Sequence, residues 1–184
     1  MLVVLGMFAW STAEANHFYG ATGQTGCGAP NMADNATHSF YYDASLPTYM
    51  RDKMNEIRTE SYNPTDINTV TSTDPNGQTD VIVYQQNYSN FCGISWHGSG
   101  GSTVGLTNCV SLSGSACQKF EVRFDSSYTG GATAGQRKYL TCHESGHTLG
   151  LGHRLPSSSC MIPLVSSTET SIDQHDRDAI NANY

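Results

Sequence analysis

The longest periodic stretch of apolar residues predicts an amphipathic helix over residues 46–62. Leu46, Met50, Met54 and Ile57 recur at spacings of four, four and three, so they share one helical face. A second helix is predicted over residues 136–149, because glycines follow it closely, and a third over residues 172–184.

Alternating or continuous apolar runs predict strands between these helices. They are residues 38–42, 67–73, 80–84, 103–108 and 120–125, of which the run DVIVY is the most apolar and is predicted to be buried. Gly- and Ser-rich stretches at 98–102 and 126–135 are predicted as loops. The order strand, helix, several strands, helix, loop, helix predicts an α+β domain with one twisted sheet. A chain of 184 residues suits one such domain.

The N-terminus has the pattern of a signal peptide. Residues 2–10 are apolar and residues 11–15 resemble an A-x-A cleavage site, although no basic residue precedes the apolar run. The run is too short to span a bilayer, and its alternative interpretation is a buried N-terminal element. Cleavage after residue 15 would leave residues 16–36 as an extended segment, which could serve as a short propeptide.

Composition narrows the environment and the partners. Six cysteines, an even number with no C-x-x-C pair, favour export into an oxidising compartment and disfavour a cysteine zinc ribbon or a thioredoxin-type site. The formal net charge of −7 argues against nucleic acid or anionic membranes as partners. We therefore expect a secreted, extracellular monomer with no membrane attachment in its mature form.

The stretch HESGHTLGLGH places metal-binding side chains at helical spacing. His143 and His147, four residues apart, lie on one face of a helix, so both rings can reach one metal ion. Glu144 is rotated by about 100° along the helix and can reach a bound water without being a ligand. Gly150 can adopt a positive φ and end the helix, which lets His153 approach as a third ligand. Three nitrogen ligands with an open position are typical of catalytic zinc.

This motif resembles the signature of the metzincin peptidases, in which a Met-turn follows. Met161, in the sequence SCMIP, resembles that turn in its matrixin form. Residues 171–184 are similar to the terminal helix of matrixin catalytic domains, and residues 120–125 to the strand before the active-site helix. The residue after the third histidine is Ser in many matrixins and Glu in astacins. Here it is Arg154, which leaves the subfamily open.

The resemblance implies a single α+β catalytic domain over residues 37–184, with a mostly parallel sheet, an active-site helix, a Met-turn and a C-terminal helix. It implies one catalytic Zn²⁺ held by His143, His147 and His153. It also implies an endopeptidase mechanism in which Glu144 activates a zinc-bound water.

The resemblance also assigns the surroundings of the metal. Met161 would form an apolar floor beneath the ligands, and residues 163–165 would form a wall of the substrate pocket. Residues 103–108 are the candidate edge strand for pairing with an extended polypeptide substrate, and an internal strand is the alternative.

Two cysteine hypotheses can be tested against a structure. Cys142 precedes the first ligand and Cys160 precedes Met161, so a bridge would tie the active-site helix to the Met-turn; a free buried thiol is the alternative. Cys27 lies in CGAPN, which resembles the matrixin cysteine switch, but no arginine precedes it. A disulfide is therefore the favoured role for Cys27.

Other metal sites have less support. His97 is the candidate ligand for a second zinc, yet no His-x-Asp pair accompanies it, and a hydrogen-bonded histidine is the default. Asp74, Asn76 and Asp80 could suggest structural Ca²⁺, but their spacing fails the EF-hand pattern and a turn is favoured. The alternative function is a secreted zinc-containing binding or adhesion module. Retention of Glu144 favours the peptidase, because a structural zinc site does not need it.

Overall fold

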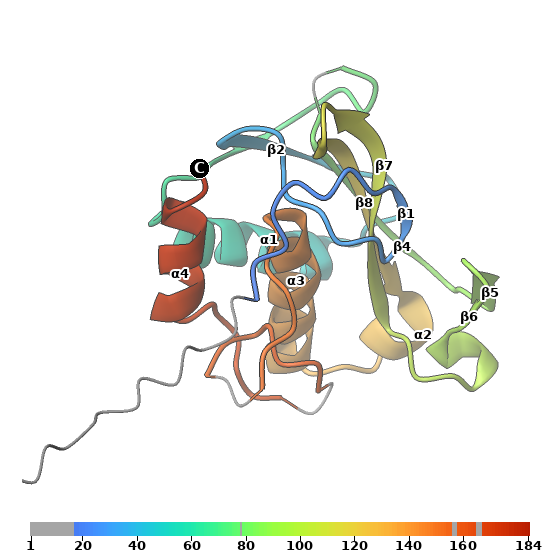
Figure 1. Ribbon diagram of the computed structural model, residues 1–184. Helices are drawn as coiled ribbons and strands as arrows, with labels where there is room; N and C mark the ends of the chain where they lie inside the picture. The colour runs from blue at the N-terminus through green and yellow to red at the C-terminus, as the bar shows by residue number, and fades with distance from the viewer. Residues whose placement is uncertain (1–16, 78, 156–157, 165–166) are drawn as a thin grey trace, which may run out of the picture.

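Helices cover one side of a mixed sheet (Figure 1). The computed structural model describes residues 17–184 except 78, 156–157 and 165–166, so the predicted signal peptide lies outside the described residues. The strands are β1 (Gly26–Cys27), β2 (Thr37–Tyr42), β3 (Asn68–Thr71), β4 (Val81–Gln86), β5 (Asn90–Phe91), β6 (Ile94–Ser95), β7 (Gly105–Ser113) and β8 (Ala116–Asp125). The helices are α1 (Thr48–Ile57), α2 (Ser126–Thr129), α3 (Ala134–Thr148) and α4 (Gln174–Asn181), with a π-helical turn at Arg58–Tyr62 and a 3₁₀ turn at His97–Ser99.

The main sheet has the order β1-β7-β8-β4-β2-β3. Strands β8, β4, β2 and β3 are parallel, whereas β7 is antiparallel to β8 and β1 is antiparallel to β7. This confirms the mostly parallel sheet. Among the described residues, the outer side of β7 is paired only by β1, at Asn108 and Cys109. The stretch Gly105 to Thr107 is therefore an exposed edge, as the edge-strand hypothesis predicts.

The predicted helical face of α1 packs into the core. Met50, Met54 and Ile57 are fully buried, and α1 packs against α3. The last part of the predicted helix is instead a π-helical turn. Its two ends are anchored, because the buried guanidinium of Arg58 donates to the Thr71 hydroxyl at 2.9 Å and the Tyr62 hydroxyl lies 2.9 Å from the Cys142 carbonyl.

Capping side chains set the starts of the later helices. Thr133 and Gln136 form a capping box at the start of α3, and Asp173 accepts from the Asp176 amide at the start of α4. The prediction of a loop throughout 126–135 is wrong at its beginning. There, Asp125 caps the short helix α2 by accepting from the Ser127 amide at 2.8 Å.

The N-terminal segment is largely extended and lies against the loop after α3 and the C-terminal residue. Phe18 forms a bridge with Leu151, and Ala33 donates its amide to the Tyr184 hydroxyl at 2.9 Å. Cys27 forms a disulfide with Cys92, so the favoured disulfide is confirmed and the cysteine-switch alternative is wrong.

Two further disulfides complete the described set. Cys142 pairs with Cys160, which confirms the predicted bridge between helix and Met-turn, and Cys109 pairs with Cys117. Within the described residues, no helix is long and apolar enough to cross a membrane.

Candidate active site

A sharp reversal after α3 brings the third histidine back toward the helix. Gly150 has φ of +87°, a conformation that favours glycine, and its amide donates to the His147 carbonyl at 3.1 Å. A Cβ at Gly150 would lie 2.9 Å from the Met32 Cβ and 3.0 Å from the Phe18 ring. Glycine is therefore required both by the turn and by the close approach of the N-terminal segment.

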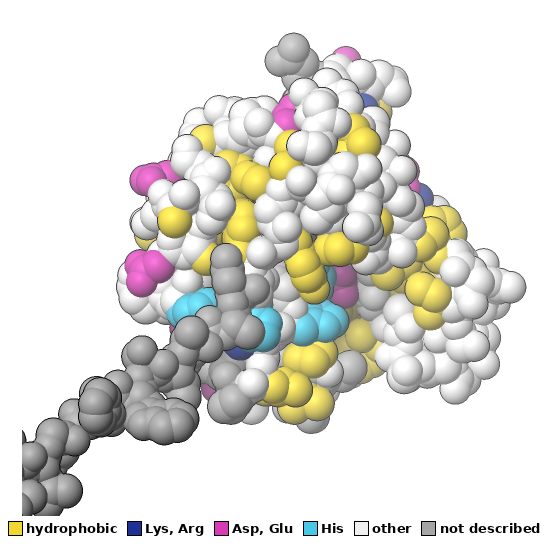
Figure 2. Space-filling view, in the orientation of Figure 1, with side chains coloured by type: hydrophobic (Ala, Val, Ile, Leu, Met, Phe, Trp, Pro, Cys, Tyr) yellow, Lys and Arg dark blue, Asp and Glu magenta, His cyan; other side chains and the backbone are white. Residues whose placement is uncertain are grey.

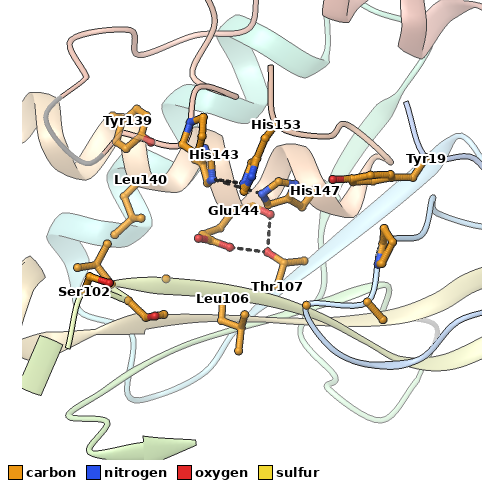
Figure 3. A pocket seen from close by; sticks show the side chains of 17 residues that line it. Tyr19, Ser102, Leu106, Thr107, Tyr139, Leu140, His143, Glu144, His147 and His153 are labelled. Carbon is orange, nitrogen blue, oxygen red and sulfur yellow. Dashed lines mark hydrogen bonds between the residues drawn. The ribbon is translucent and has the colours of Figure 1, made fainter. Parts of the chain in front are cut away.

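The three predicted ligands converge at one point (Figure 3). The Nε2 atom of His143 lies 3.3 Å from Nε2 of His147 and 3.1 Å from Nε2 of His153. Nitrogen ligands at about 2.0–2.1 Å from a tetrahedral zinc ion would be about 3.3 Å from one another. The spacing of the three rings therefore fits a zinc ion.

The other ring nitrogens fix the tautomers. Nδ1 of His143 lies 2.8 Å from the Cys160 carbonyl, and Nδ1 of His147 lies 2.8 Å from the Leu151 carbonyl. A carbonyl only accepts, so each Nδ1 carries the proton and each Nε2 presents a lone pair. Lone pairs that face one another at this distance need a cation between them. The donor set therefore fits a metal better than a hydrogen-bonded histidine cluster.

Burial keeps the histidines in the neutral, metal-binding form. Desolvation lowers the pKa of His143 to about 4, against a smaller opposite effect from the Cys160 carbonyl. Desolvation also lowers the pKa of His147 well below its usual value, and that of His153 to a smaller extent.

Glu144 lies beside the histidines, between α3 and the exposed edge of β7. Desolvation raises the pKa of its carboxyl to about 7, and a hydrogen bond from Thr107 partly offsets this. The Thr107 hydroxyl lies 2.8 Å from Oε2 and 2.7 Å from the backbone carbonyl of Glu144. A Cβ at Gly105 would lie 2.5 Å from Oε1, so the carboxylate needs glycine there. Gly105 and Thr107 are two residues apart in the predicted strand. Because side chains alternate between the two faces of a strand, this spacing places both residues on one face.

Comparison with known proteins assigns the chain to a family. A family model described as matrixin matches residues 39–184, most of the chain. The chain belongs to the matrixin family. It is accordingly a zinc metalloendopeptidase, and the family implies the zinc for which the three histidines are suited.

One solved structure agrees on the fold of this matrixin. A structure of myroilysin aligns with a TM-score of 0.51 at 11% identity and covers 84% of this chain and 82% of that chain. This likeness shows the fold alone. A second structure of myroilysin has a TM-score of 0.39 at 15% identity and covers 67% of this chain and 47% of that chain. No curated protein matches the chain.

The predicted Met-turn packs against α3, the helix that carries His143 and His147. Met161 is fully buried, and a Cβ at Gly146 would lie 2.5 Å from its Sδ atom. The adjoining Cys160 has two roles, since it forms the disulfide with Cys142 and also supplies the carbonyl that orients His143. The Met-turn thus fixes both the position and the tautomer of His143, a predicted ligand.

The histidines open into a cleft of about 470 Å³ between α3 and β7. Figure 2 shows histidine side chains on this face, with a carboxylate and hydrophobic side chains beside them. Pro163 lines the cleft as predicted, Leu164 does not, and Val165 lies outside the described residues. Sequence reasoning missed the lining residues Tyr19, Gly28, Ala29, Pro30, Tyr139 and Leu140.

The other metal hypotheses gain no support in the described part of the chain. The His97 ring lies 3.0 Å from the Ser127 hydroxyl, as expected of a hydrogen-bonded histidine, and His97 belongs to no cluster of potential ligands there. Asp74 accepts from the Asn76 amide at 2.8 Å, which fits the predicted turn. Arg154, which stands where many matrixins have Ser and astacins have Glu, forms an ion pair with Asp173 and so ties the loop that contains His153 to the start of α4.

Proposed function

We propose that this matrixin is a secreted endopeptidase that hydrolyses extended polypeptides. His143, His147 and His153 would hold the zinc ion, and Glu144 would be the catalytic base. The observation that carries the proposal is the convergence of three Nε2 atoms, with that of His143 lying 3.3 Å from that of His147 and 3.1 Å from that of His153, beside one buried carboxylate. Bound zinc would lower the pKa of a water molecule and polarise the scissile carbonyl.

Glu144 is suited to moving protons in both directions. With a pKa of about 7, its carboxyl can accept a proton from the attacking water and then deliver it to the leaving amine near neutral pH. The Thr107 hydroxyl would position the carboxylate by holding Oε2. The opposite carboxylate oxygen, Oε1, is close to Gly105 at the edge of β7.

The exposed edge of β7 supports an extended substrate. Backbone N–H and C=O groups between Gly105 and Thr107 are available for β-pairing with a peptide, and this stretch lines the same cleft as the histidines. A peptide added there would pass directly over Glu144. This arrangement favours cleavage of unfolded or extended segments over compact ones.

Secretion is supported by two independent features. Disulfides of this number are typical of oxidising compartments, and the N-terminal sequence has a signal-peptide pattern. Expression of the full chain in a secreting host should release a protein whose sequence begins at Asn16. Retention of residues 1–15 in the released protein would contradict this part of the proposal.

Substitution of Glu144 tests the chemistry. Glu144→Gln should still bind one zinc ion, yet its kcat on casein or quenched peptides should fall by at least about 10³-fold, because a general base is lost. Glu60→Gln is the matched control, since Glu60 forms only a surface pair with Lys138. A zinc-loaded wild type without peptidase activity would instead favour the binding or adhesion module.

A further inference from the structure

We propose that the N-terminal segment closes one end of the cleft and limits how far a substrate extends past the scissile bond on that side. This inference rests on the proposed endopeptidase function. It adds a specificity element formed by residues 17–32, which lie outside the stretch that matches the matrixin model. We call this element the end wall.

The end wall and the substrate would share one edge of the sheet, end to end. Strand β1 pairs with β7 so that Cys27 lies opposite Asn108 and Gly26 opposite Cys109. Gly28 has φ of +65° and turns the chain away, while its amide donates to the Asn108 side chain at 3.0 Å. A peptide paired with the exposed part of β7 would therefore meet β1 directly after Thr107.

The reacting groups lie close to this barrier. Gly105 and Thr107 are the β7 residues that contact Glu144, and Asn108 is already covered by β1. At about 3.4 Å per residue, an extended peptide has room for roughly two residues between the scissile bond and the end wall. In the other direction Val104, Thr103 and Ser102 line the cleft, but the Thr103 carbonyl already accepts from the His97 amide at 2.9 Å. Beyond Val104 a substrate would therefore contact the cleft lining without backbone pairing.

Side chains complete the barrier above the strand. In Figure 3, Tyr19 lies at the His147 end of the cleft, whereas Ser102, Tyr139 and Leu140 lie at the opposite end. The Tyr19 ring packs on Gly152, where a Cβ would lie 2.9 Å from its Cζ atom.

Backbone bonds and one disulfide hold the end wall in place. The Tyr19 amide donates to the Gly150 carbonyl at 2.8 Å, and the Cys117 amide donates to the Met32 carbonyl at 2.8 Å. The Cys27–Cys92 disulfide joins the tip of the wall to a residue 65 positions away. A segment tied at both ends and at its tip is a fixed barrier, unlike a lid that opens for each substrate.

The residues of the end wall that face the cleft should also favour some substrate side chains over others. The wall residues that line the cleft are Tyr19, Gly28, Ala29 and Pro30, all uncharged. A charged substrate side chain placed against them would lose hydration without gaining a partner. The terminal subsite on this side should therefore favour neutral residues.

Two nested series of quenched peptides test the barrier. Both series share one cleavage sequence and are lengthened one alanine at a time, either at the N-terminal or at the C-terminal end. In the wild type, kcat/KM should stop rising after about two residues in one series, while in the other each paired residue should add up to about fivefold. Equal dependence on length at both ends would overturn the inference.

Two variants connect the asymmetry to the end wall. The double variant Cys27→Ser with Cys92→Ser releases the tip, and Tyr19→Ala removes a half-exposed ring without changing the backbone. Each should raise kcat/KM for the longer peptides of the limited series and leave the other series unchanged. Tyr41→Ala is the matched control, because Tyr41 does not line the cleft.

The outcomes separate this inference from the proposed function. If no peptide is cleaved by zinc-loaded wild type, the endopeptidase proposal fails. If peptides are cleaved and neither variant moves the plateau of the limited series, only the end wall is refuted. Should the cysteine variant fail to fold, the comparison of the two length series in the wild type still decides the inference.

Discussion

The two walls of the cleft are built in opposite ways. The α3 wall takes its proposed zinc ligands and its Met-turn from one short stretch of sequence, between His143 and Met161, which the Cys142–Cys160 disulfide crosslinks. The β7 wall combines a strand with the N-terminal segment and depends on Cys27–Cys92, whose partners are 65 residues apart. One wall holds the reacting groups, and the other decides which peptides reach them.

This difference indicates which wall should tolerate substitutions better. Metal geometry requires atoms held within a few tenths of an ångström, which short-range contacts and a buried disulfide provide. Peptide selection requires only a surface of the right length, and a distant segment can supply it. Apart from Glu144 itself, variants in the α3 wall should therefore affect zinc binding or stability, whereas variants in the β7 wall should affect turnover and length preference.

The largest expected effect comes from the disulfide of the α3 wall. Replacing both Cys142 and Cys160 with serine removes a crosslink over 18 residues, which should lower the free energy of unfolding by about 3 kcal/mol. Zinc affinity should also fall by about tenfold or more, because the Cys160 carbonyl orients His143.

The Cys109–Cys117 disulfide is the control. Its two cysteines are eight residues apart in the sequence, and it lies away from the three histidines. Its double serine variant should lose stability by chain entropy yet keep zinc affinity. Calorimetric zinc titration of both variants gives the comparison. An equal loss of affinity in both would show that the two walls do not differ in this respect.

A methyl group at Gly105 should break the contact between the walls. Its Cβ would lie 2.5 Å from Oε1 of Glu144, so Gly105→Ala should displace the carboxylate and lower kcat by about 10²-fold, or about 2.7 kcal/mol. Gly135→Ala, at a position where the new Cβ meets nothing within 4 Å, should keep full activity. Steady-state kinetics of both variants tests this, and an active Gly105→Ala enzyme would contradict it.

The same contrast decides what the sequence could predict. The positions of His143, Glu144 and His147 follow from helical spacing within one element, and Gly150 indicates the turn that returns His153. Periodicity predicted the sheet and α1 for the same reason, because each pattern lies within a single element. The edge position of β7 remained one of two alternatives, because period-two alternation does not reveal what lies beside a strand.

The end wall could not be predicted from local patterns. Residues 17–32 have no periodicity, and their path is set by partners such as Gly150, Asn108 and Cys117. A disulfide was the favoured role for Cys27, but six cysteines allow fifteen pairing schemes, and nothing in the sequence identified Cys92 as its partner. Contacts between residues distant in sequence leave no trace in composition or spacing.

A pH titration tests how the α3 wall is joined to the sheet. His38, on β2, lies fully buried with Nε2 2.8 Å from the Thr148 hydroxyl, and desolvation lowers its pKa to about 3. In the unfolded chain the histidine pKa is near 6.5. Between pH 6.5 and about 3, His38 is therefore protonated in the unfolded chain and neutral in the folded chain. Stability should therefore fall as pH drops below 6.5, by about 2 kcal/mol at pH 5 from this group.

His38→Gln isolates this group, because glutamine keeps a hydrogen-bond donor for Thr148 but does not titrate. Urea unfolding with a chelator present should show a weaker loss of stability between pH 6.5 and 5 in the variant than in the wild type. Parallel curves would mean that His38 does not contribute to acid sensitivity.

The smallest effect should come from Thr107, where the β7 wall touches the chemistry. Thr107→Val preserves the shape of the side chain but removes the hydroxyl that holds Oε2 of Glu144, so kcat should fall by about tenfold, or about 1.4 kcal/mol, with little change in KM. Thr107→Ser keeps the hydroxyl and should retain most of the turnover. If serine loses as much kcat as valine, packing of the β7 wall matters and its hydroxyl does not. If Thr107→Val retains full kcat, the buried carboxylate of Glu144 is positioned by α3 alone, and the β7 wall does not contribute to the chemistry.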